Sequence, residues 1–244
     1  MRALDGTRIL LTRSQRGCAQ WAARVREQGG VPVSFPCISR VPVAASDDTA
    51  TRLRDSVDRA DWLALTSPFG AEVAARLLEN DLPELVAVAV VGPATAAVAQ
   101  RRFGRVDLLA AGGTGAALAT QLLGRLNLAA ESAPRVVVAA AEGGLEDLEQ
   151  ELEPRGVTVE RFAIYRTEPG PPLERRERFA SAIDVVLVAS PSAVDGLQAR
   201  AEIDPHIPIV TIGPTTSAAV EAAGMRVAAQ AEHRSLEAML EAIP

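Results

Sequence analysis

The chain repeats itself, because three kinds of segment occur in order and then occur again. The copies are, in order, residues 8–40 and 135–167, DWLALTSP (61–68) and DVVLVASP (184–191), and VAVVGPATAAVA (88–99) and PIVTIGPTTSAAV (208–220). The copies are separated by similar distances along the chain: Gly29 and Gly156 lie 127 residues apart, and Gly92 and Gly213 lie 121 residues apart. Three ordered matches indicate that the chain contains two versions of one structural unit.

Each repeated segment begins with a short apolar run that ends in small or hydroxylated residues and opens into an alanine-rich, helix-like stretch. Runs of this length are typical of buried parallel strands, and strands that alternate with helices indicate a parallel sheet covered on both faces. We therefore predict an α/β fold of two doubly wound parallel-sheet domains. In the helix expected at 14–29, Ala19, Ala22, Ala23 and Val25 are predicted to face inward, and ERRER at 174–178 is predicted to be a solvated helix face. The expected strands are RILLTR, WLALTS, VAVVG, VDLLA, RVVVAA, VVLVAS, IVTIG and RVAAQ.

Two extended, proline-punctuated tails fall at the same place in each repeat, at 32–43 and 160–172. They have the character of two crossings between domains. The residues alone allow two consecutive domains, or an exchange in which the chain enters the second domain and later returns to the first. Ordinary surface strands are a further alternative.

Composition removes several classes of function. The chain has 25 basic and 31 acidic residues, a net charge of −6, and no lysine. A Schiff base, a lysine general base and a phosphate-loop lysine are therefore excluded, and nucleic acid is not an expected partner. Two cysteines and two histidines far apart predict no metal site. No apolar run reaches membrane-spanning length, so we expect a soluble, cytoplasmic protein without a membrane partner.

The candidate binding residues follow the strands, because open α/β sheets bind ligands beyond the carboxyl ends of their strands. Most of these positions combine a helix-capping residue with proline in the first turn, so that free backbone N–H groups point outward. Helix N-termini of this kind bind carboxylates or phosphates, and several that face one cleft would bind a polyanion without lysine. Any single one can equally be a simple helix cap, so the functional case depends on the set. The set is Thr12, Arg13, Thr66, Ser67, Gly92, Thr95, Ser190, Ser192, Gly213, Thr215 and Thr216.

Tyr165 is the only tyrosine in the chain, and it takes the place that Ile38 has in the first repeat. A phenol is protonated at neutral pH and can donate a hydrogen bond or act as a general acid. The alternative is a packing tyrosine with a buried ring and a solvated hydroxyl.

Taken in order, the motifs resemble the uroporphyrinogen-III synthase family. They are TR after the first strand, TSP and ASPS at the ends of later strands, VGPAT and IGPTT opening helices, and the YRT tail, and the likeness runs from Arg8 to about Leu240. The resemblance implies two flavodoxin-like domains joined by a two-stranded β linker. It favours the exchange, with domain 1 as 1–37 plus 171–244, domain 2 as 44–162, and linker strands at 38–43 and 163–170.

The resemblance also implies the activity. Members of this family close the linear tetrapyrrole hydroxymethylbilane to uroporphyrinogen III, with inversion of ring D and loss of water, in a reaction that needs no cofactor. The tyrosine of the family's Y-x-T motif falls on Tyr165, as the expected catalytic residue that assists the departing hydroxyl group. The other candidate residues would hold the substrate's carboxylates. A monomer, with the upstream deaminase as a possible protein partner, is expected.

One departure from the family pattern concerns the segment after RVVVAA, which in the family often carries an arginine where this chain has Leu145. A cationic partner for a carboxylate is thus missing there, and Glu142 adds a negative charge nearby. The alternative function is therefore a non-enzymatic, two-domain binding or regulatory relative that closes on a tetrapyrrole or another small anion. A pair of receiver domains fits less well, because such domains need clustered acidic residues and a lysine.

Overall fold

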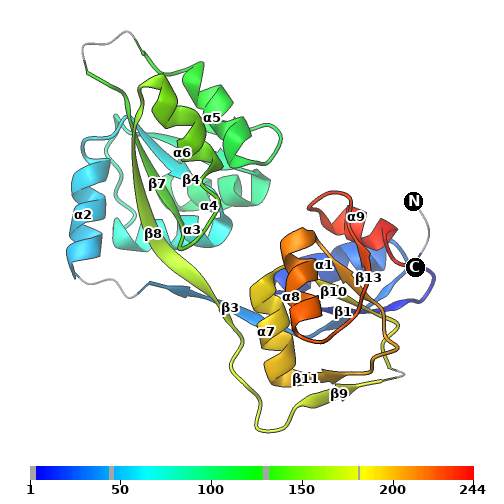
Figure 1. Cartoon of the computed structure of the whole chain (residues 1–244). Helices are drawn as coiled ribbons and strands as arrows, with labels where there is room; N and C mark the ends of the chain where they lie inside the picture. Colours follow the sequence, from blue (N-terminus) through cyan, green and yellow to red (C-terminus); the bar gives the residue numbers. More distant parts are fainter. Residues whose placement is uncertain (1–3, 44–46, 129–131, 181) are drawn as a thin grey trace. The chain divides into compact units, whose positions relative to one another are not determined.

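The structure is a computed structural model that describes residues 4–43, 47–128, 132–180 and 182–244 (Figure 1). Contacts within the chain divide it into two units. Unit 1 comprises Met1–Arg40 and Thr167–Pro244, and unit 2 comprises Val41–Arg166. The beginning and the end of the chain therefore belong to one unit, and the middle forms the other. Residues 1 and 44, at which the two predicted domains begin, lie outside the described residues.

Unit 1 is built on a five-stranded sheet whose spatial order is β2-β1-β10-β12-β13, with every neighbouring pair parallel. A short parallel pair, β9 and β11, lies apart from it. The strands are β1 (Arg8–Leu11), β2 (Val31–Ser34), β9 (Glu177–Phe179), β10 (Val185–Val188), β11 (Ala201–Ile203), β12 (Ile209–Thr211) and β13 (Val227–Gln230). The helices are α1 (Gln15–Glu27), α7 (Pro191–Arg200), α8 (Pro214–Ala222) and α9 (Leu236–Glu241).

Unit 2 contains the sheet β3-β8-β7-β4-β5-β6, in which the pairs from β8 to β6 are parallel. The strands are β3 (Ile38–Pro42), β4 (Trp62–Leu65), β5 (Ala87–Val91), β6 (Leu108–Ala110), β7 (Arg135–Ala141) and β8 (Thr158–Pro169). The helices are α2 (Asp47–Val57), α3 (Pro68–Leu77), α4 (Pro93–Phe103), α5 (Gly115–Leu123) and α6 (Asp147–Leu152), followed by the 3₁₀ turn η1 (Glu153–Arg155). The predicted fold class, an α/β chain with two doubly wound parallel sheets, is confirmed.

The two repeats occupy equivalent places in the two sheets, although the chain visits them in a different order. In unit 1 the repeat that contains β1 and β2 comes first, whereas its counterpart β7 and β8 comes last in unit 2. Both sheets nevertheless have the same spatial order, β2-β1-β10-β12-β13 in one and β8-β7-β4-β5-β6 in the other. Unit 2 is thus a circularly permuted version of unit 1.

Strands β3 and β8 are neighbours in the sheet, and each runs through a boundary between the units. The backbone N–H of Val43 donates to the carbonyl oxygen of Ile164 (3.0 Å), and that of Gly170 donates to the carbonyl oxygen of Cys37 (2.5 Å). Residue numbers rise along one strand as they fall along the other, so the pair is antiparallel. The unit boundaries, after Arg40 and after Arg166, fall within the segments 38–43 and 163–170.

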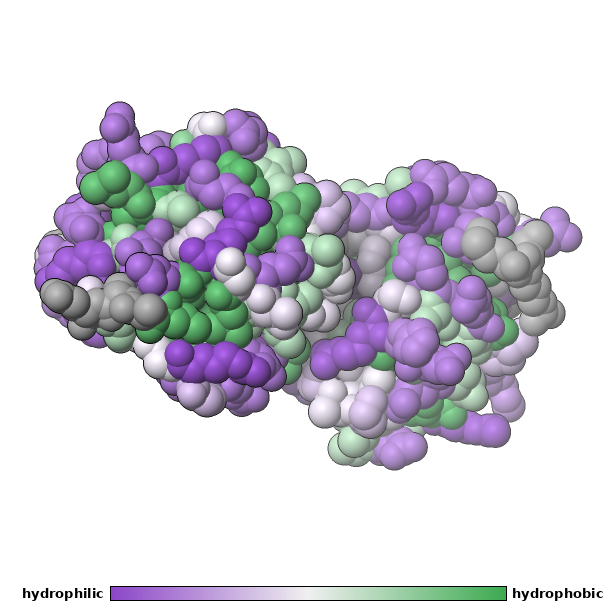
Figure 2. All heavy atoms as spheres, turned by 90° about the horizontal axis from the view of Figure 1, so that it is seen from above, coloured by the Kyte–Doolittle hydropathy of each residue, from purple (hydrophilic) through white to green (hydrophobic). Residues whose placement is uncertain are grey.

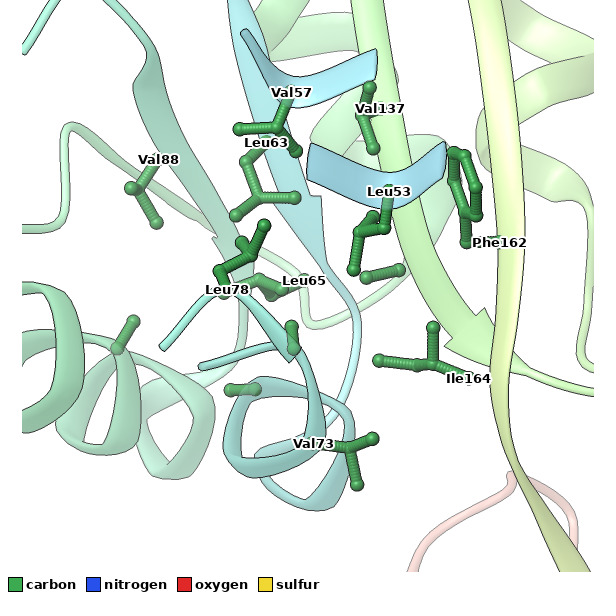
Figure 3. Close-up of a cluster of buried hydrophobic side chains, with 14 of the residues drawn as sticks. Leu53, Val57, Leu63, Leu65, Val73, Leu78, Val88, Val137, Phe162 and Ile164 are labelled. Carbon is green, nitrogen blue, oxygen red and sulfur yellow. The ribbon is translucent and has the colours of Figure 1, made fainter. Parts of the chain in front are cut away.

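Each sheet buries both faces, because alternate residues of its strands enter different cores. In unit 2, Leu63 and Leu65 pack with α2, α3 and α4, whereas Trp62 and Ala64 pack with α5 and α6. Figure 3 shows the first of these cores, with Phe162 and Ile164 of β8 lying beside side chains of β4, β7 and α2. Truncation of one such buried leucine to alanine costs about 2–5 kcal/mol, so these cores hold each unit's helices on its sheet.

Two expectations about local structure are wrong. In α1, Ala22 and Val25 are buried as predicted, and so is Trp21, but Ala19 and Ala23 are exposed. At 3.6 residues per turn, positions 18, 21, 22 and 25 share one face, and the larger Cys18 and Trp21 side chains occupy it. The segment 174–178 is not helical, since Glu177 begins strand β9.

The face drawn in Figure 2 is a mixture of hydrophilic residues and smaller apolar areas. Among the described residues, the most exposed large apolar side chains are Leu85 (95% exposed) and Leu145 (72%). No helix in the described part of the chain is long and apolar enough to cross a membrane.

Candidate functional site

The predicted site residues lie where the parallel strands of each unit end. Because all strands of a parallel sheet point the same way, the segments that follow them gather at one edge. On unit 2 this edge carries Thr66, Ser67, Gly92, Thr95 and Tyr165. On unit 1 the corresponding edge carries Thr12, Arg13, Ser190, Ser192, Gly213, Thr215 and Thr216.

A β-bulge in β8 turns Tyr165 into the core of unit 2. Ala140 of β7 pairs with Ala163, but the next residue, Ala141, pairs with Tyr165, so that β8 contains one extra residue at Ile164. In a regular strand, Ile164 and Tyr165 would point to opposite faces. Here both side chains are buried in the same apolar cluster. The bulge therefore redirects the tyrosine, and the sequence pattern alone gave no sign of it.

The tyrosine ring is held tightly at the edge of that core. Its ring packs against Phe69 in an edge-to-face arrangement, with centroids 5.2 Å apart. Gly70 leaves room for it, since a Cβ atom at that position would lie 3.2 Å from Tyr165 Cε1 and 3.0 Å from Ser67 Oγ. Only 5% of the tyrosine is exposed, so both its packing and its hydroxyl partner fix where the phenol lies.

That partner is Ser67. The Ser67 Oγ and Tyr165 hydroxyl oxygens are 2.8 Å apart, a full hydrogen bond in which either atom can be the donor. Ser67 is also the N-cap of α3, where its Oγ accepts the backbone N–H of Gly70 at 2.9 Å. The structure therefore brings together two residues that the sequence placed 98 positions apart, one predicted as catalytic and the other as binding.

The remaining predicted residues of unit 2 contribute mainly backbone. Gly92 is the N-cap of α4 with a positive φ of 78°, and it provides no side-chain cap, so the first N–H groups of this helix stay available. Thr95, in the first turn of α4, is buried, whereas Thr66 is half-buried. The N-terminus of α5 differs, because the carboxylate of Asp147 already accepts the Ala116 N–H (3.1 Å).

Arg161 of β8 is hydrogen-bonded to the turn after β7, which contains Leu145. Its guanidinium donates to the carbonyl oxygens of Ala141 and Leu145 (both 3.4 Å) and forms an ion pair with the buried Glu149 of α6. Gly144 lets the guanidinium pass, since a Cβ atom there would lie 3.0 Å from Arg161 Nη2. Arg161 therefore does not replace the arginine that the family often has at the position of Leu145, because Glu149 neutralises the charge of Arg161.

In unit 1, several predicted hydroxyl groups are occupied within the protein. Thr12 is fully buried, and its Oγ1 donates to the carbonyl oxygen of Leu187 (2.8 Å). Thr216 is 1% exposed. Ser190 caps α7 by accepting the Ala193 N–H at 3.2 Å. The side chains of Thr12 and Thr216 have no free surface, so only their backbone can reach a ligand.

Two further residues of unit 1, Ser192 and Thr215, remain accessible, whereas Gly213 is buried. Ser192 is half-buried, with its Oγ 3.4 Å from that of Ser190, and Thr215 is exposed in the first turn of α8. Gly213 is the N-cap of α8 and makes no side-chain cap there. At the N-terminus of α8 no side chain caps the first N–H groups and Thr215 is exposed, whereas α7 is capped by Ser190; both ends are candidate anion contacts.

Arg13 is the one predicted site residue with a full charge. Its guanidinium carbon lies 4.5 Å from the centre of the Trp21 ring, which holds it in a cation–π contact. Burial, and secondly the nearby positive charge of Arg40, lower the pKa of Arg13. Within the described ranges, neither arginine has a carboxylate partner, whereas Arg8, Arg24, Arg54 and Arg161 are all in ion pairs. Arg40, which the sequence did not point to, is thus a second cation close to Arg13.

The arrangement supports binding of a polyanion and donation of a proton. Among the described residues there is no group of three histidine, cysteine, aspartate or glutamate side chains placed to hold a metal ion. Both cysteines are buried thiols, and burial raises the pKa of Cys37 to about 12, so neither is a ready nucleophile. What remains is the backbone N–H groups at the strand ends, the side chains of Arg13 and Arg40, and the Tyr165 phenol hydrogen-bonded to Ser67.

Comparison with known proteins agrees with this chemistry. Residues 19–241 match the model of the family described as uroporphyrinogen-III synthase HemD. The porphyrin biosynthesis protein HemD of Ruminiclostridium josui is 30% identical over 70 residues, which are 29% of this chain and 14% of that protein. The chain therefore matches only a small part of this curated relative.

Two solved structures show the same fold over nearly the whole chain. Uroporphyrinogen-III synthetase from Helicobacter pylori has a TM-score of 0.57 at 16% identity, covering 96% of this chain and 97% of that one. A mutant uroporphyrinogen III synthase from Thermus thermophilus has a TM-score of 0.53 at 17% identity, covering 97% of this chain and 96% of that one. Since the family model spans most of the chain, the protein belongs to the uroporphyrinogen-III synthase HemD family.

Proposed function

We propose that this chain is a uroporphyrinogen-III synthase, a cofactor-independent lyase that closes hydroxymethylbilane with inversion of ring D and loss of water. Family membership supports the reaction class. The observation that carries the proposal to this chain is the phenol of Tyr165, packed against Phe69 and hydrogen-bonded to Ser67 at the strand ends of unit 2. A phenol held there can give its proton to a departing hydroxyl group.

The rest of the proposed site has to hold a flexible chain that carries eight carboxylates. The helix N-termini at Gly92, Ser190 and Gly213, together with Arg13 and Arg40, offer donors of the right sign. Fixing the two ends of the bilane in the geometry of ring closure contributes more than any single group, because the linear substrate also cyclises unaided, to the isomer without inversion. Binding and orientation thus select the product, and Tyr165 speeds the loss of water.

A coupled assay tests the activity. With hydroxymethylbilane produced in place by a deaminase, the protein should shift the product from uroporphyrinogen I to uroporphyrinogen III. Tyr165→Phe should lower kcat by roughly 10-fold or more while KM changes little, because the ring and its packing remain. Accumulation of isomer I alone would refute the activity, and an unchanged kcat would remove Tyr165 from catalysis.

The alternative, a non-enzymatic binding relative, is favoured by one observation, the exposed Leu145 in place of an arginine. It predicts that a tetrapyrrole binds to the chain while isomer III never forms, so the same assay separates the two. Action as a monomer, a cytoplasmic location and contact with the upstream deaminase stay predictions. Gel filtration with and without the deaminase tests the first and the last.

A further inference from the structure

Ser67 has one proton and two lone pairs, and the structure accounts for one of those lone pairs. Its Oγ accepts the backbone N–H of Gly70, because Ser67 is the N-cap of a ten-residue helix, α3. This bond anchors the oxygen at the helix end. The hydroxyl proton and the second lone pair remain for the contact with Tyr165, at 2.8 Å.

Two proton arrangements satisfy this contact, and they have opposite consequences. If Tyr165 donates to Ser67, the phenol proton points at the serine and is unavailable to a substrate. If Ser67 donates to Tyr165, the phenol proton is free to point outward, and the phenolic oxygen already has a donor directed at it. Only the second arrangement suits a proton donor.

The surroundings favour the second arrangement during the reaction. As the phenol loses its proton, negative charge develops on its oxygen, and a hydrogen bond to a charged acceptor is stronger than one to a neutral acceptor. The N-terminus of α3, to which Ser67 is tied, carries a positive partial charge that favours an anion nearby. Ser190, the equivalent serine of unit 1, caps α7 in the same way, but no tyrosine contacts it among the described residues.

We propose that Ser67 is a positioning residue that donates its hydroxyl proton to Tyr165, so that the Tyr165 proton faces the substrate's leaving group; this rests on the function proposed above. In the step, the Tyr165 O–H bond breaks and its proton joins the departing hydroxyl oxygen. The carbon–oxygen bond breaks with its electron pair on that oxygen, and water leaves. The phenolate accepts the Ser67 hydrogen bond until ring D has been inverted and its unsubstituted α-carbon, which forms the last ring-closing bond, loses its proton and so restores the phenol.

The test is a double-mutant cycle on the full chain in the coupled assay. Ser67→Ala should lower kcat about 10-fold with little change in KM, and Ser67→Thr, which keeps a hydroxyl and a cap, should recover most of it. In the Tyr165→Phe background, Ser67→Ala should cause no further loss of kcat, because Ser67 acts through the phenol. Equal losses of kcat in both backgrounds would overturn the proposal.

Two further variants separate positioning from helix capping. Ser67→Asp keeps a strong N-cap but cannot donate a proton, so it should retain the melting temperature and lose kcat as Ser67→Ala does. Ser235→Ala removes a comparable serine cap from α9, where Ser235 Oγ accepts the Ala238 N–H at 3.1 Å, and it should lower stability without lowering kcat. Full activity of Ser67→Asp would overturn the proposal. If the unmodified protein makes no isomer III, it is the proposed function that fails instead.

Discussion

At the scale of the residue, one aspartate in each unit joins the starts of two neighbouring strands, β1 and β10 in unit 1 and β7 and β4 in unit 2. Asp184 Oδ2 accepts the backbone N–H of Arg8 at 2.8 Å, and Asp61 Oδ2 accepts that of Arg135 at 2.7 Å. In unit 1 the contact is stronger, because the Arg8 side chain also donates to both carboxylate oxygens of Asp184.

The Asp184–Arg8 contact predicts that the stability of the folded protein decreases slightly at acid pH. The Arg8 side chain, and next its backbone N–H, lower the pKa of Asp184 from 3.8 to about 2. A depressed pKa stabilises the folded state above pH 4, and that stabilisation is lost as the pH falls from about 4 to about 2. Because the pair is exposed, Asp184→Asn should lower the melting temperature at pH 7 by only about 2 °C, with the difference vanishing near pH 2.

Thermal unfolding followed by circular dichroism between pH 2 and 7 measures this difference. Arg8→Gln is the matched control, since it removes the guanidinium but keeps the backbone N–H, and it should show a smaller effect of the same sign. A difference between the Asp184→Asn variant and the unmodified chain that persists at pH 2 would contradict the explanation.

Arg13 and Arg40 make a separate prediction about substrate binding. Replacement of either by methionine, which keeps an apolar stem, should raise KM about 10-fold and leave kcat nearly unchanged, because each removes a cationic partner for a carboxylate. Arg24→Met, at an exposed ion pair on the same unit, should change neither constant. Steady-state kinetics of the three variants decide the question, and unaltered KM for Arg13→Met and Arg40→Met would exclude the pair from binding.

At the scale of the element, α7 packs closely against the backbone at Cys37, just before β3. A Cβ atom on Gly196 of α7 would lie 1.8 Å from the carbonyl oxygen of Cys37, which itself accepts the Gly170 N–H. Position 196 therefore requires glycine for space and not for an unusual φ. The helix could not approach the segment this closely with any side chain there.

Gly196→Ala should accordingly lower the free energy of unfolding by about 3 kcal/mol, because backbone and helix must separate to admit a methyl group. Urea unfolding measures the loss. Gly213→Ala is the control, since a Cβ atom there meets nothing within 4 Å, and it should cost less than about 0.5 kcal/mol. Equal stability of the two variants would show that the Cys37 contact is relaxed in solution.

At the scale of the whole molecule, the permuted order of the repeats decides which parts of the chain can fold alone. Strands β4 to β7 and most of β8, with their covering helices, lie in the continuous stretch 41–166. Unit 1 needs two separate stretches, because β1 at its centre pairs with both β2 and β10. Without residues 1–40, its two cores lose Ile9, Leu10 and Leu11, all of which are fully buried.

We therefore expect the fragment 41–166 to unfold cooperatively on heating, and the fragment 167–244 to show no cooperative transition. Joining residue 40 to residue 167 by a short Gly-Ser linker should restore one, since Gly170 is hydrogen-bonded to Cys37 and the two ends are close. Calorimetry of the three polypeptides tests this. A cooperative transition of 167–244 alone would contradict it.

The sequence by itself determined the local elements and their class. Apolar runs such as RVVVAA became buried strands, and Ser67 and Ser190 became N-caps, because strand burial and helix capping depend on residues within a few positions. The repeat also predicted two equivalent α/β units. It failed where a choice among near neighbours depended on packing, as for Ala19 and Ala23 in α1, which are exposed while Cys18 is buried.

Only the tertiary structure decided which distant residues meet. The hydrogen bond between Ser67 and Tyr165 depends on a bulge at Ile164, and on β7 and β4 being neighbours although 69 residues lie between them in the chain. The proximity of Arg40 to Arg13 depends likewise on the segment before β3, where the Cys37 N–H donates to the carbonyl oxygen of Arg13 (3.1 Å). Such contacts cost chain entropy that long-range packing must repay, so no local pattern records them. The sequence therefore specified the parts of the site, and the strand order brought them together.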